Sequence, residues 1–352
     1  MSDRWDQAGL KARVDRVLRS FLDEEAGHLS AVDEALAPVA DQLLKAAGHG
    51  KRLRAAFCYW GWRAAGQPES DALVRAAASM ELVHAAAIVH DDLIDDSRLR
   101  HGLPTAHVAL EAVLTRDGRP DAGTAARSLA MLVGDHLMVL AGRLFTTSGL
   151  PAAYLARARD LWAALARELI AGECLEILHT GGSPDTETSL KVVRYKTAKY
   201  TVEHPLLIGG LLAGAAPALR DTYRAYGLPL GEAFQLRDDL LGLFGEQERT
   251  GKAGLDDLRA HRPTALLAET WKAADASQRD HLRSLLGRGD LDATHLHDVR
   301  RLMLELKAPQ RVEQMIAGRV ERAVRALDAP GTPPQARRAL RELAQQATDR
   351  VH

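Results

Sequence analysis

Apolar residues recur at helical spacing along most of this 352-residue chain, in blocks that are rich in alanine. Apolar side chains at positions i, i+3, i+4 and i+7 form one face of an α-helix, whereas the alternation typical of strands is nearly absent. The pattern therefore predicts an all-α fold of about ten to twelve helices. The helical blocks are 5–28, 31–47, 68–91, 106–116, 124–146, 152–179, 187–203, 217–243 and 264–287.

No proline- or serine-rich linker divides these blocks, and the chain has no internal repeat. Glycine and proline breakers separate neighbouring blocks, as they do between helices of one bundle. We therefore expect a single domain over residues 1–352, with an N-terminal helical segment at 1–28. The segment 328–335 contains glycine and prolines and is expected to be the loop before the C-terminal helix.

The overall charge excludes some classes of partner. Lys and Arg number 46 against 47 Asp and Glu, which gives a formal net charge of −1, so no global field would recruit nucleic acid or an anionic membrane. The N-terminus lacks the apolar core of a signal peptide, and charges or histidines interrupt the apolar runs. The cysteines are only Cys58 and Cys174. We expect a cytoplasmic protein without an integral membrane segment.

Two acidic motifs lie inside apolar helical sequence. An Asp-Asp-Leu-Ile-Asp-Asp run begins at Asp91, so that Asp91 and Asp95 share one helix face, with Asp92 beside them. A second pair is Asp238 and Asp239. Carboxylates that converge from two helices repel each other unless cations lie between them, and hard oxygen ligands select Mg²⁺ or Mn²⁺. Mg²⁺ often completes its shell with phosphate oxygens, so the substrate is expected to be a diphosphate.

Both acidic motifs also fit roles that involve no metal. A run of solvated charges could simply end a helix at Asp95, although negative charge there opposes the helix dipole. In the second motif, Arg237 could pair with the neighbouring aspartates.

Basic residues could supply the complement to a diphosphate. Lys51 and Arg54 lie three residues apart at the start of a helix, Arg100 follows the first acidic motif, and Lys196 and Lys252 lie further along. Each of these taken alone is more often a solvated side chain. Together they could surround one or two diphosphates.

A histidine precedes the first acidic motif by two helical turns. His84 lies seven residues before Asp91, on the same face. It is either a core histidine with its hydrogen bonds satisfied or a donor to a diphosphate oxygen.

As a set, these motifs resemble the all-trans polyprenyl diphosphate synthases, the short-chain isoprenyl diphosphate synthase family. The resemblance extends from about Gly48 to Thr264. The matching segments are Gly50–Arg54, Glu81–His84, Asp91–Asp96, Arg98–Thr105, Gly134–Asp135, Lys196–Tyr200 and Phe234–Asp239.

The resemblance implies a single-domain isoprenoid synthase bundle around a central cavity, and a prenyltransferase activity. Such enzymes ionise an allylic diphosphate (dimethylallyl, geranyl or farnesyl) and condense it with isopentenyl diphosphate. It further implies three Mg²⁺ ions per active site, with Mn²⁺ as an alternative, and a homodimer. No nucleic acid is implied.

The resemblance also assigns roles to residues. Asp91, Asp95 and Asp238 hold Mg²⁺, and Asp92 and Asp239 complete the metal set. The further catalytic residues are Lys196, Thr197 and Gln235, of which Thr197 and Gln235 steady the cation and leaving group. The residues expected on the two diphosphates are Lys51, Arg54, His84, Arg100, His101, Lys196 and Lys252.

Two positions depart from the family pattern. Relatives usually carry arginine at His101, where it helps to bind isopentenyl diphosphate, and a third aspartate at Gly242. A neutral histidine supplies at most one donor and no fixed charge, so affinity for that substrate is expected to be lower and to depend on pH. Near Gly172, relatives often have Gln and Asp where this chain has Glu173 and Glu176.

Product length can be argued from helix geometry. One helical turn rises about 5.4 Å, comparable to one isoprene unit. Relatives that make the fifteen-carbon product block the channel with aromatic residues near Ala86 and Ala87, which are small here. Val83 lies one turn further, and Met80 is expected to end the channel nearer twenty to twenty-five carbons. This favours geranylgeranyl diphosphate, and the chain resembles the synthases of that product.

Two alternatives remain on the same scaffold. A class I terpene cyclase would ionise without elongating, which His101 and Gly242 favour and which the intact Lys51, Arg54 and His84 oppose. A regulatory subunit of a heteromeric prenyl synthase would lack acidic motifs, and this chain has them.

Overall fold

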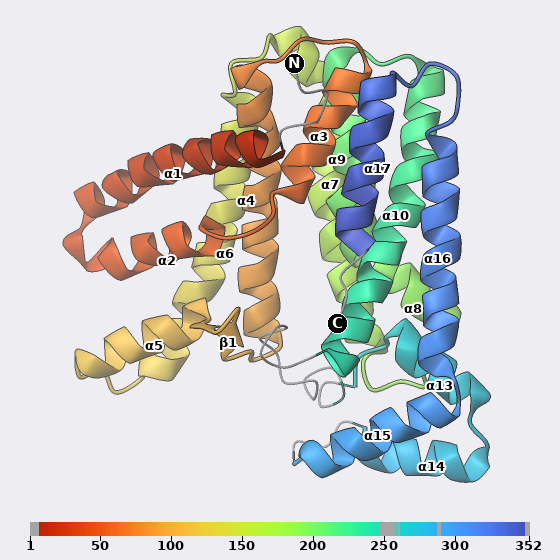
Figure 1. Ribbon diagram of the computed structural model, residues 1–352. Coiled ribbons are helices and arrows are strands. Elements are labelled where there is room, and N and C mark those ends of the chain that lie inside the picture. The colour runs from red at the N-terminus through yellow and green to blue at the C-terminus, as the bar shows by residue number, and fades with distance from the viewer. Residues whose placement is uncertain (1–6, 246–257, 259–260, 287–289, 349–352) are drawn as a thin grey trace. The chain divides into compact units, whose positions relative to one another are not determined.

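The computed structural model describes residues 7–245, 258, 261–286 and 290–348 (Figure 1). These residues are 81% helical and form 14 helices. That count treats α8 (Thr186–Val192), the π-helical segment η2 (Val193–Glu203) and α9 (His204–Ala213) as one continuous run. The predicted all-α class is confirmed.

Backbone contacts divide the chain into two compact units. Unit 1 comprises Met1–Arg159 and Ile208–Gly214, and unit 2 comprises Asp160–Leu207 and Ala215–His352. The single domain expected from the sequence stays a prediction.

Unit 1 is organised around α4, whose long apolar sequence is buried on most sides, as expected for a core helix. The side chain of Ser70 caps its start by accepting a hydrogen bond from the Leu73 N–H. Helices α1, α2, α3 and α6 pack against it, and α5 packs against α6 (Figure 1). The helical elements are α1 (Gln7–Val32), the 3₁₀ turn η1 (Glu34–Leu36), α2 (Ala37–Ala47), α3 (Leu53–Ala64), α4 (Asp71–Ile94), α5 (Ala106–Arg116), α6 (Ala122–Thr146), the first residues of α7 (Ala152–His179) and the end of α9.

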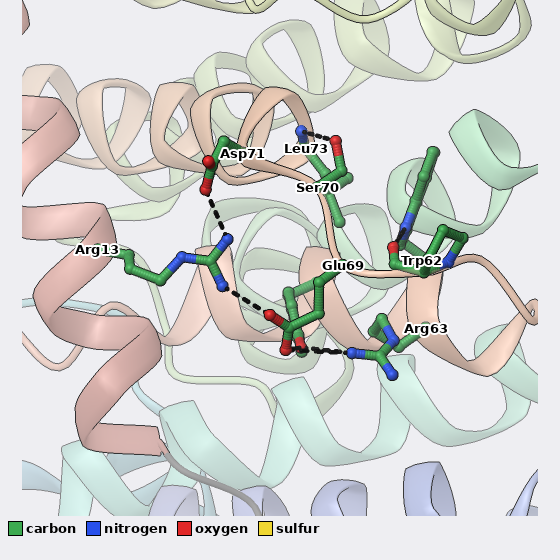
Figure 2. A network of polar contacts seen from close by, with 9 residues as sticks. Arg13, Trp62, Arg63, Glu69, Ser70, Asp71 and Leu73 are labelled. Atoms are coloured by element: carbon green, nitrogen blue, oxygen red, sulfur yellow. Dashed lines mark hydrogen bonds and ion pairs between the residues drawn. The ribbon is translucent and has the colours of Figure 1, made fainter.

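A polar network fastens α1 to the connection between α3 and α4 (Figure 2). The Arg13 guanidinium contacts Glu69 at 3.3 Å and Asp71 at 2.8 Å. Glu69 also accepts hydrogen bonds from the Tyr59 hydroxyl at 2.7 Å and from Arg63 at 3.3 Å. Burial and the bond to Glu69 raise the pKa of Tyr59 to about 12. The network fixes the start of α4, at whose other end the first acidic motif lies.

A short hairpin follows α4, in a segment for which the sequence predicted no strand. Strands β1 (Leu99–Arg100) and β2 (Leu103–Pro104) pair antiparallel. The two residues between them, His101 and Gly102, both have positive φ, at 52° and 77°. Two-residue hairpins favour turns of this type. His101 therefore occupies a tight turn rather than a helix.

Unit 2 is organised around α10, against which η2, α13, α16 and α17 pack. Its apolar core is formed by residues of α10, α13, α14, α15 and α16. Pro217 starts α10 at a position where proline is well tolerated. The elements are the C-terminal part of α7, α8, η2, the start of α9, α10 (Pro217–Phe244), α13 (Ala265–Ala273), α14 (Ala276–Leu285), α15 (Ala293–Glu305), α16 (Ala308–Ala326) and α17 (Pro334–Thr348).

The helix expected over 264–287 is two helices in the structure. Helix α13 ends at Ala273, and Asp275 starts α14 with a capping box to Gln278. Such a box satisfies two backbone N–H groups that a new helix leaves without partners. Together with α15, which the sequence did not separate, this split explains why the helices exceed the expected number.

The π-helical segment η2 depends on glycines in the helices beside it. A Cβ atom on Gly231 of α10 would lie 2.5 Å from the Ala198 carbonyl oxygen, and one on Gly172 of α7 would lie 2.1 Å from the Lys196 nitrogen. A π-helix is wider than an α-helix and often marks a functional site. The two glycines provide the space that the wide segment needs.

Helices α4 and α6 are long and apolar enough to cross a membrane by length and composition. Charges and histidines interrupt both apolar runs, at Glu81 and His84 in α4 and at Asp135 and His136 in α6. In addition, 72% of the apolar window of α4 and 44% of that of α6 are buried inside the structure. The core helices of soluble proteins pass the same test, so these two helices carry little weight for a membrane segment.

Gly231→Ala is predicted to disturb η2, because the new methyl group meets backbone that cannot rotate away. We expect the melting temperature to fall by several degrees, corresponding to about 1–3 kcal/mol. The matched control is Gly318→Ala on α16, where a Cβ meets nothing within 4 Å. That variant should be neutral or more stable. Equal melting temperatures for the two variants would contradict the packing argument.

Candidate active site

The first acidic motif lies where α4 ends. Asp95 caps the helix, Asp96 adopts the left-handed conformation with φ 52°, and the Ser97 N–H donates to the Asp92 carbonyl at 2.9 Å. This is the Schellman arrangement that stops a helix. Asp91 and Asp95 remain partly exposed, one turn apart. They can therefore both reach a cation on the same face.

Asp92 differs from its neighbour because it is buried, with 4% of its surface exposed. The Nε of Arg100 donates to Asp92 at 3.0 Å, and its terminal nitrogen lies 3.2 Å from Asp91. Burial alone would lower the pKa of Arg100, but the hydrogen bonds and charges of Asp92 and Asp91 raise it. The structure thus brings the predicted diphosphate ligand Arg100 onto the first acidic motif.

The last aspartate of the run anchors the helix end. Arg127 of α6 contacts the Asp96 carboxylate at 2.6 Å and donates to the Leu93 carbonyl at 3.0 Å. Nothing in the sequence around Arg127 points to this role, because the contact bridges 31 positions. Arg127 holds the end of α4 and so fixes the direction of the motif.

A neutral histidine lies among arginines near this motif. Burial lowers the pKa of His84 well below its usual value, and the charges of Arg54, Arg100 and Arg52 lower it further, whereas Asp91 acts in the opposite direction. His84 is therefore uncharged at pH 7 and can donate one hydrogen bond. Guanidinium groups around a neutral donor form a suitable site for an anion.

The segment before α3 is held by partners at some distance in the sequence. Arg52 has φ 58°, contacts the Asp15 carboxylate at 2.7 Å and donates to the Ala47 carbonyl at 2.7 Å. The buried carboxylate of Glu81 accepts a hydrogen bond from the Ala55 N–H at 2.9 Å, at the first turn of α3. Arg52 and Glu81 thus hold the backbone at the start of α3. The sequence indicated them only as members of the motifs Gly50–Arg54 and Glu81–His84. They place Lys51 and Arg54, the predicted diphosphate ligands.

In unit 2, η2 presents two lysines to acidic residues of α7. Lys196 lies 2.8 Å from Glu173 and also pairs with Glu176. Lys199 lies 2.8 Å from Glu168. The sequence analysis noted Glu173 and Glu176 only because relatives often carry Gln and Asp at these positions. In the structure both carboxylates contact Lys196.

Thr197 and Gln235, predicted to act together, are hydrogen-bonded. The Thr197 hydroxyl donates to the Gln235 side-chain oxygen at 2.7 Å, and the Gln235 amide donates to the Asp239 carboxylate at 2.8 Å. Arg237 points elsewhere: it pairs with Glu313 of α16 and donates to a carbonyl of α17. These contacts disfavour the alternative in which Arg237 pairs with the second acidic motif.

Other predicted residues occupy varied places. His101 is exposed at the turn of the hairpin. Met80, Val83 and Ala86 are buried in α4, whereas Ala87 is partly exposed on the Asp91 side. Asp238 is partly exposed on α10. Lys252 lies outside the described residues.

Comparison with known proteins defines the class. The family model for polyprenyl synthetase matches residues 33–303. The chain therefore belongs to the polyprenyl synthetase family, and the predicted family and prenyltransferase class are confirmed.

Individual relatives support the same class. The chain is 33% identical over 266 residues to (2E,6E)-farnesyl diphosphate synthase of Mycobacterium tuberculosis, covering 75% of this chain and 67% of that protein. It is 31% identical over 244 residues to octaprenyl diphosphate synthase of Escherichia coli, covering 69% of each. These relatives make products of different length, so family membership leaves product length unresolved.

A solved structure is similar over the whole chain. Geranylgeranyl pyrophosphate synthase of Corynebacterium glutamicum, complexed with isoprenyl diphosphate and magnesium, superposes with a TM-score of 0.94. It is 33% identical and covers 99% of this chain and 100% of that one. The helical fold is thus that of a known prenyl diphosphate synthase.

The neutral His84 leads to a prediction about acid stability. A histidine whose folded pKa is depressed stabilises the fold above its unfolded pKa, and this contribution is lost as pH falls below about 6.5. We expect the unfolding free energy of the wild type to fall by up to about 1.4 kcal/mol per pH unit from this group. His84→Asn should flatten that slope. Urea unfolding at pH 7.5 and 5.5 measures it.

The control is His281→Asn, at an exposed position on α14. It should keep the wild-type slope. If His84→Asn and His281→Asn showed the same dependence on pH, the pKa of His84 would not be depressed in the folded state.

Proposed function

We propose that this chain is a Mg²⁺-dependent prenyltransferase that condenses isopentenyl diphosphate with an allylic diphosphate to give an all-trans polyprenyl diphosphate. The observation that carries the proposal is the arrangement at the end of α4. Asp91 and Asp95 are partly exposed, the guanidinium of Arg100 contacts Asp91, and the neutral His84 lies two helical turns before Asp91 on the same face. Carboxylates for cations and donors for an anion are what a magnesium diphosphate requires.

The donor set fits magnesium. The partly exposed carboxylates of Asp91, Asp95 and Asp238 offer hard oxygen ligands, and no sulfur or imidazole group is needed. Bound Mg²⁺ would act as a Lewis acid that neutralises charge on the leaving diphosphate. Asp92 and Asp239, whose side chains are hydrogen-bonded to protein donors, were also expected in the metal set, and this stays a prediction. The number of ions and the use of Mn²⁺ stay predictions as well.

The chain's own residues would divide the remaining work. Lys51, Arg54 and His84 would orient the isopentenyl diphosphate by contacts to its phosphates. Arg100 and Lys196 would hold the allylic diphosphate. To do so, Lys196 would exchange its ion pairs with Glu173 and Glu176 for contacts to substrate oxygens. His101 and Lys252 stay predicted ligands of the diphosphates. Holding both substrates in one reactive geometry supplies much of the rate enhancement, because the entropy that is lost when two molecules come together no longer adds to the activation barrier.

After the C–O bond of the allylic diphosphate breaks, a cation must be stabilised until it is attacked. The oxygens of Thr197 and Gln235 are proposed for this task, since they are acceptors in a hydrogen-bonded pair. The double bond of isopentenyl diphosphate then attacks the cation, and a proton is lost to the released diphosphate. Each cycle adds five carbons.

The test is reconstitution with Mg²⁺, isopentenyl diphosphate and each allylic diphosphate in turn. Prenyl diphosphates longer than the starter are expected. Hydrocarbon or alcohol from the allylic diphosphate alone would instead identify a class I terpene cyclase. Activity only after addition of another subunit would identify a component of a heteromeric synthase.

Asp91→Asn is predicted to lower kcat/KM by roughly a thousandfold, because an isosteric amide is a much weaker Mg²⁺ ligand. Circular dichroism should show an unchanged helix content. The control is Asp117→Asn, at an exposed position after α5, and should retain wild-type turnover. Full activity of Asp91→Asn would exclude this residue as a metal ligand.

We further propose geranylgeranyl diphosphate as the product. Along the Asp91 face of α4, Ala87 and His84 are partly exposed, and Met80, about 16 Å away by helix rise, is fully buried. The accessible part of this face therefore ends at Met80, which supports a limit beyond fifteen carbons. No aromatic side chain stands at Ala86 or Ala87.

Substitutions at this face should move the product length in opposite directions. Ala87→Phe is expected to shorten the product to about fifteen carbons, since the ring fills one turn of the face, or about 5.4 Å. Met80→Ala is expected to lengthen it. Product analysis by mass spectrometry after matched conversions measures both. An unchanged product from both variants would show that this face does not line the channel.

A homodimer is also proposed. On α6, Leu132 and Val139 are two turns apart on one face and are 53% and 69% exposed, with Met131 beside them at 48%. A row of large exposed apolar side chains commonly marks a protein interface. Light scattering gives the mass in solution and tests this.

We propose a cytoplasmic location. Cys58 is buried and Cys174 is exposed, and both are free thiols. Free thiols are the state that a reducing compartment maintains. Fractionation of the native host would locate the protein.

A further inference from the structure

The two aspartates of the second motif face different sides of α10. Consecutive residues on an α-helix are rotated by about 100°. Asp239 lies one turn after Gln235 and one turn before the buried Leu243, and only 9% of Asp239 is exposed. Asp238 is more exposed and shares its side with Gly242. The two carboxylates therefore meet different surroundings.

Asp239 belongs to the protein interior. It lines a small cavity together with Arg262, Thr264 and apolar side chains that include Leu243 and Met303. Its carboxylate accepts the hydrogen bond from the Gln235 amide at 2.8 Å. A carboxylate in such surroundings must be held by donors, because an isolated buried charge is costly.

The carboxylate dictates which way the Gln235 amide points. An ionised carboxylate can only accept hydrogen bonds, so the NH₂ end of Gln235 must face Asp239 and the carbonyl end must face the other way. That carbonyl in turn can only accept, so the hydroxyl proton of Thr197 is committed to it, at an oxygen–oxygen distance of 2.7 Å. The Thr197 oxygen then offers lone pairs alone to any further group.

We propose that Asp239 is a positioning residue whose carboxylate orients the Gln235 amide, so that Gln235 and Thr197 present oxygen lone pairs to the allylic cation. This inference rests on the proposed prenyltransferase function. Hydrogen bonds in a chain polarise one another, so the charge of Asp239 also increases the electron density on the two oxygens. Without Asp239 the amide can rotate and present its NH₂ group, which repels a cation.

The decisive comparison uses Asp239→Asn and Asp238→Asn. An asparagine at 239 offers an NH₂ donor as well as an oxygen and carries no charge, so it no longer fixes the direction of the Gln235 amide, and kcat should fall by about tenfold. Calorimetry with Mg²⁺ and inorganic pyrophosphate should give wild-type affinity for Asp239→Asn and at least about tenfold weaker affinity for Asp238→Asn. If both substitutions weakened the binding of magnesium pyrophosphate equally, Asp239 would be a metal ligand, as the resemblance to the family implies, and the inference would be wrong.

A second comparison tests the chain of hydrogen bonds. Asp239→Ala and Thr197→Val should each lower kcat by about 10- to 100-fold, the size expected for a hydrogen bond that acts on a charge. The double variant should be no slower than the slower single variant, since both interrupt one chain. Multiplying effects would overturn the inference.

The two comparisons separate the inference from the proposed function. If the wild type formed no prenyl diphosphate, the proposed function would fail, whereas the calorimetric comparison would still decide whether Asp239 binds metal. If Asp239→Ala failed to fold, the isosteric Asp239→Asn would still decide the question. Thermal melting of each variant identifies that case.

Discussion

The structure depends on how charged side chains are held within an apolar, alanine-rich helical frame. Removing an ion from water costs several kcal/mol unless a partner compensates for it. The buried Asp92 is paired with Arg100, and the buried Glu232 of α10 is paired with Arg194 of η2 at 3.0 Å and Arg319 of α16 at 2.8 Å. Each pair joins different elements, so the charges fix the register between elements that apolar packing alone would leave free to slide.

Irregular backbone segments position several of the candidate site residues. The first acidic motif ends at a Schellman cap, which leaves Asp95 at the final turn of α4, and the hairpin that follows returns Arg100 to the motif. Lys196 and Thr197 project from a π-helical segment that exists because Gly172 and Gly231 leave room for it. Such features are tolerated where their groups find partners. In each unit some candidate site residues, such as Asp95, Lys196 and Thr197, lie where a regular α-helix ends or widens.

Much of the fold could be predicted from the sequence. The expected helices 106–116 and 152–179 have the bounds of α5 and α7, because long helices carry a clear apolar period and glycine or proline breakers flank them. The hairpin could not be predicted, since two-residue strands carry no alternation. The π segment has ordinary helical composition, so its widening depends on tertiary contacts with glycines in other helices.

The candidate site could also be predicted only in part. The Asp91 motif could be identified because carboxylates are unexpected in apolar helical sequence, whereas Lys196 was assigned a role only by the resemblance to the family. The contacts that hold the motifs could not be predicted, because Arg127 reaches Asp96 across 31 positions and Glu81 reaches the Ala55 N–H across 26. A single sequence identifies the charge of such residues but not the group that each one contacts.

The two acidic pairs follow one rule that the helix itself imposes. Consecutive positions differ by about 100° in direction, so the two aspartates of a pair meet different surroundings even where both contact one group, as Asp91 and Asp92 contact Arg100. In each pair the first aspartate, Asp91 or Asp238, keeps solvent exposure. The second aspartate is buried, 4% exposed at Asp92 and 9% at Asp239, and accepts a hydrogen bond from Arg100 or Gln235. Each pair thus joins one partly exposed carboxylate to one buried carboxylate that holds a neighbouring polar side chain by a hydrogen bond.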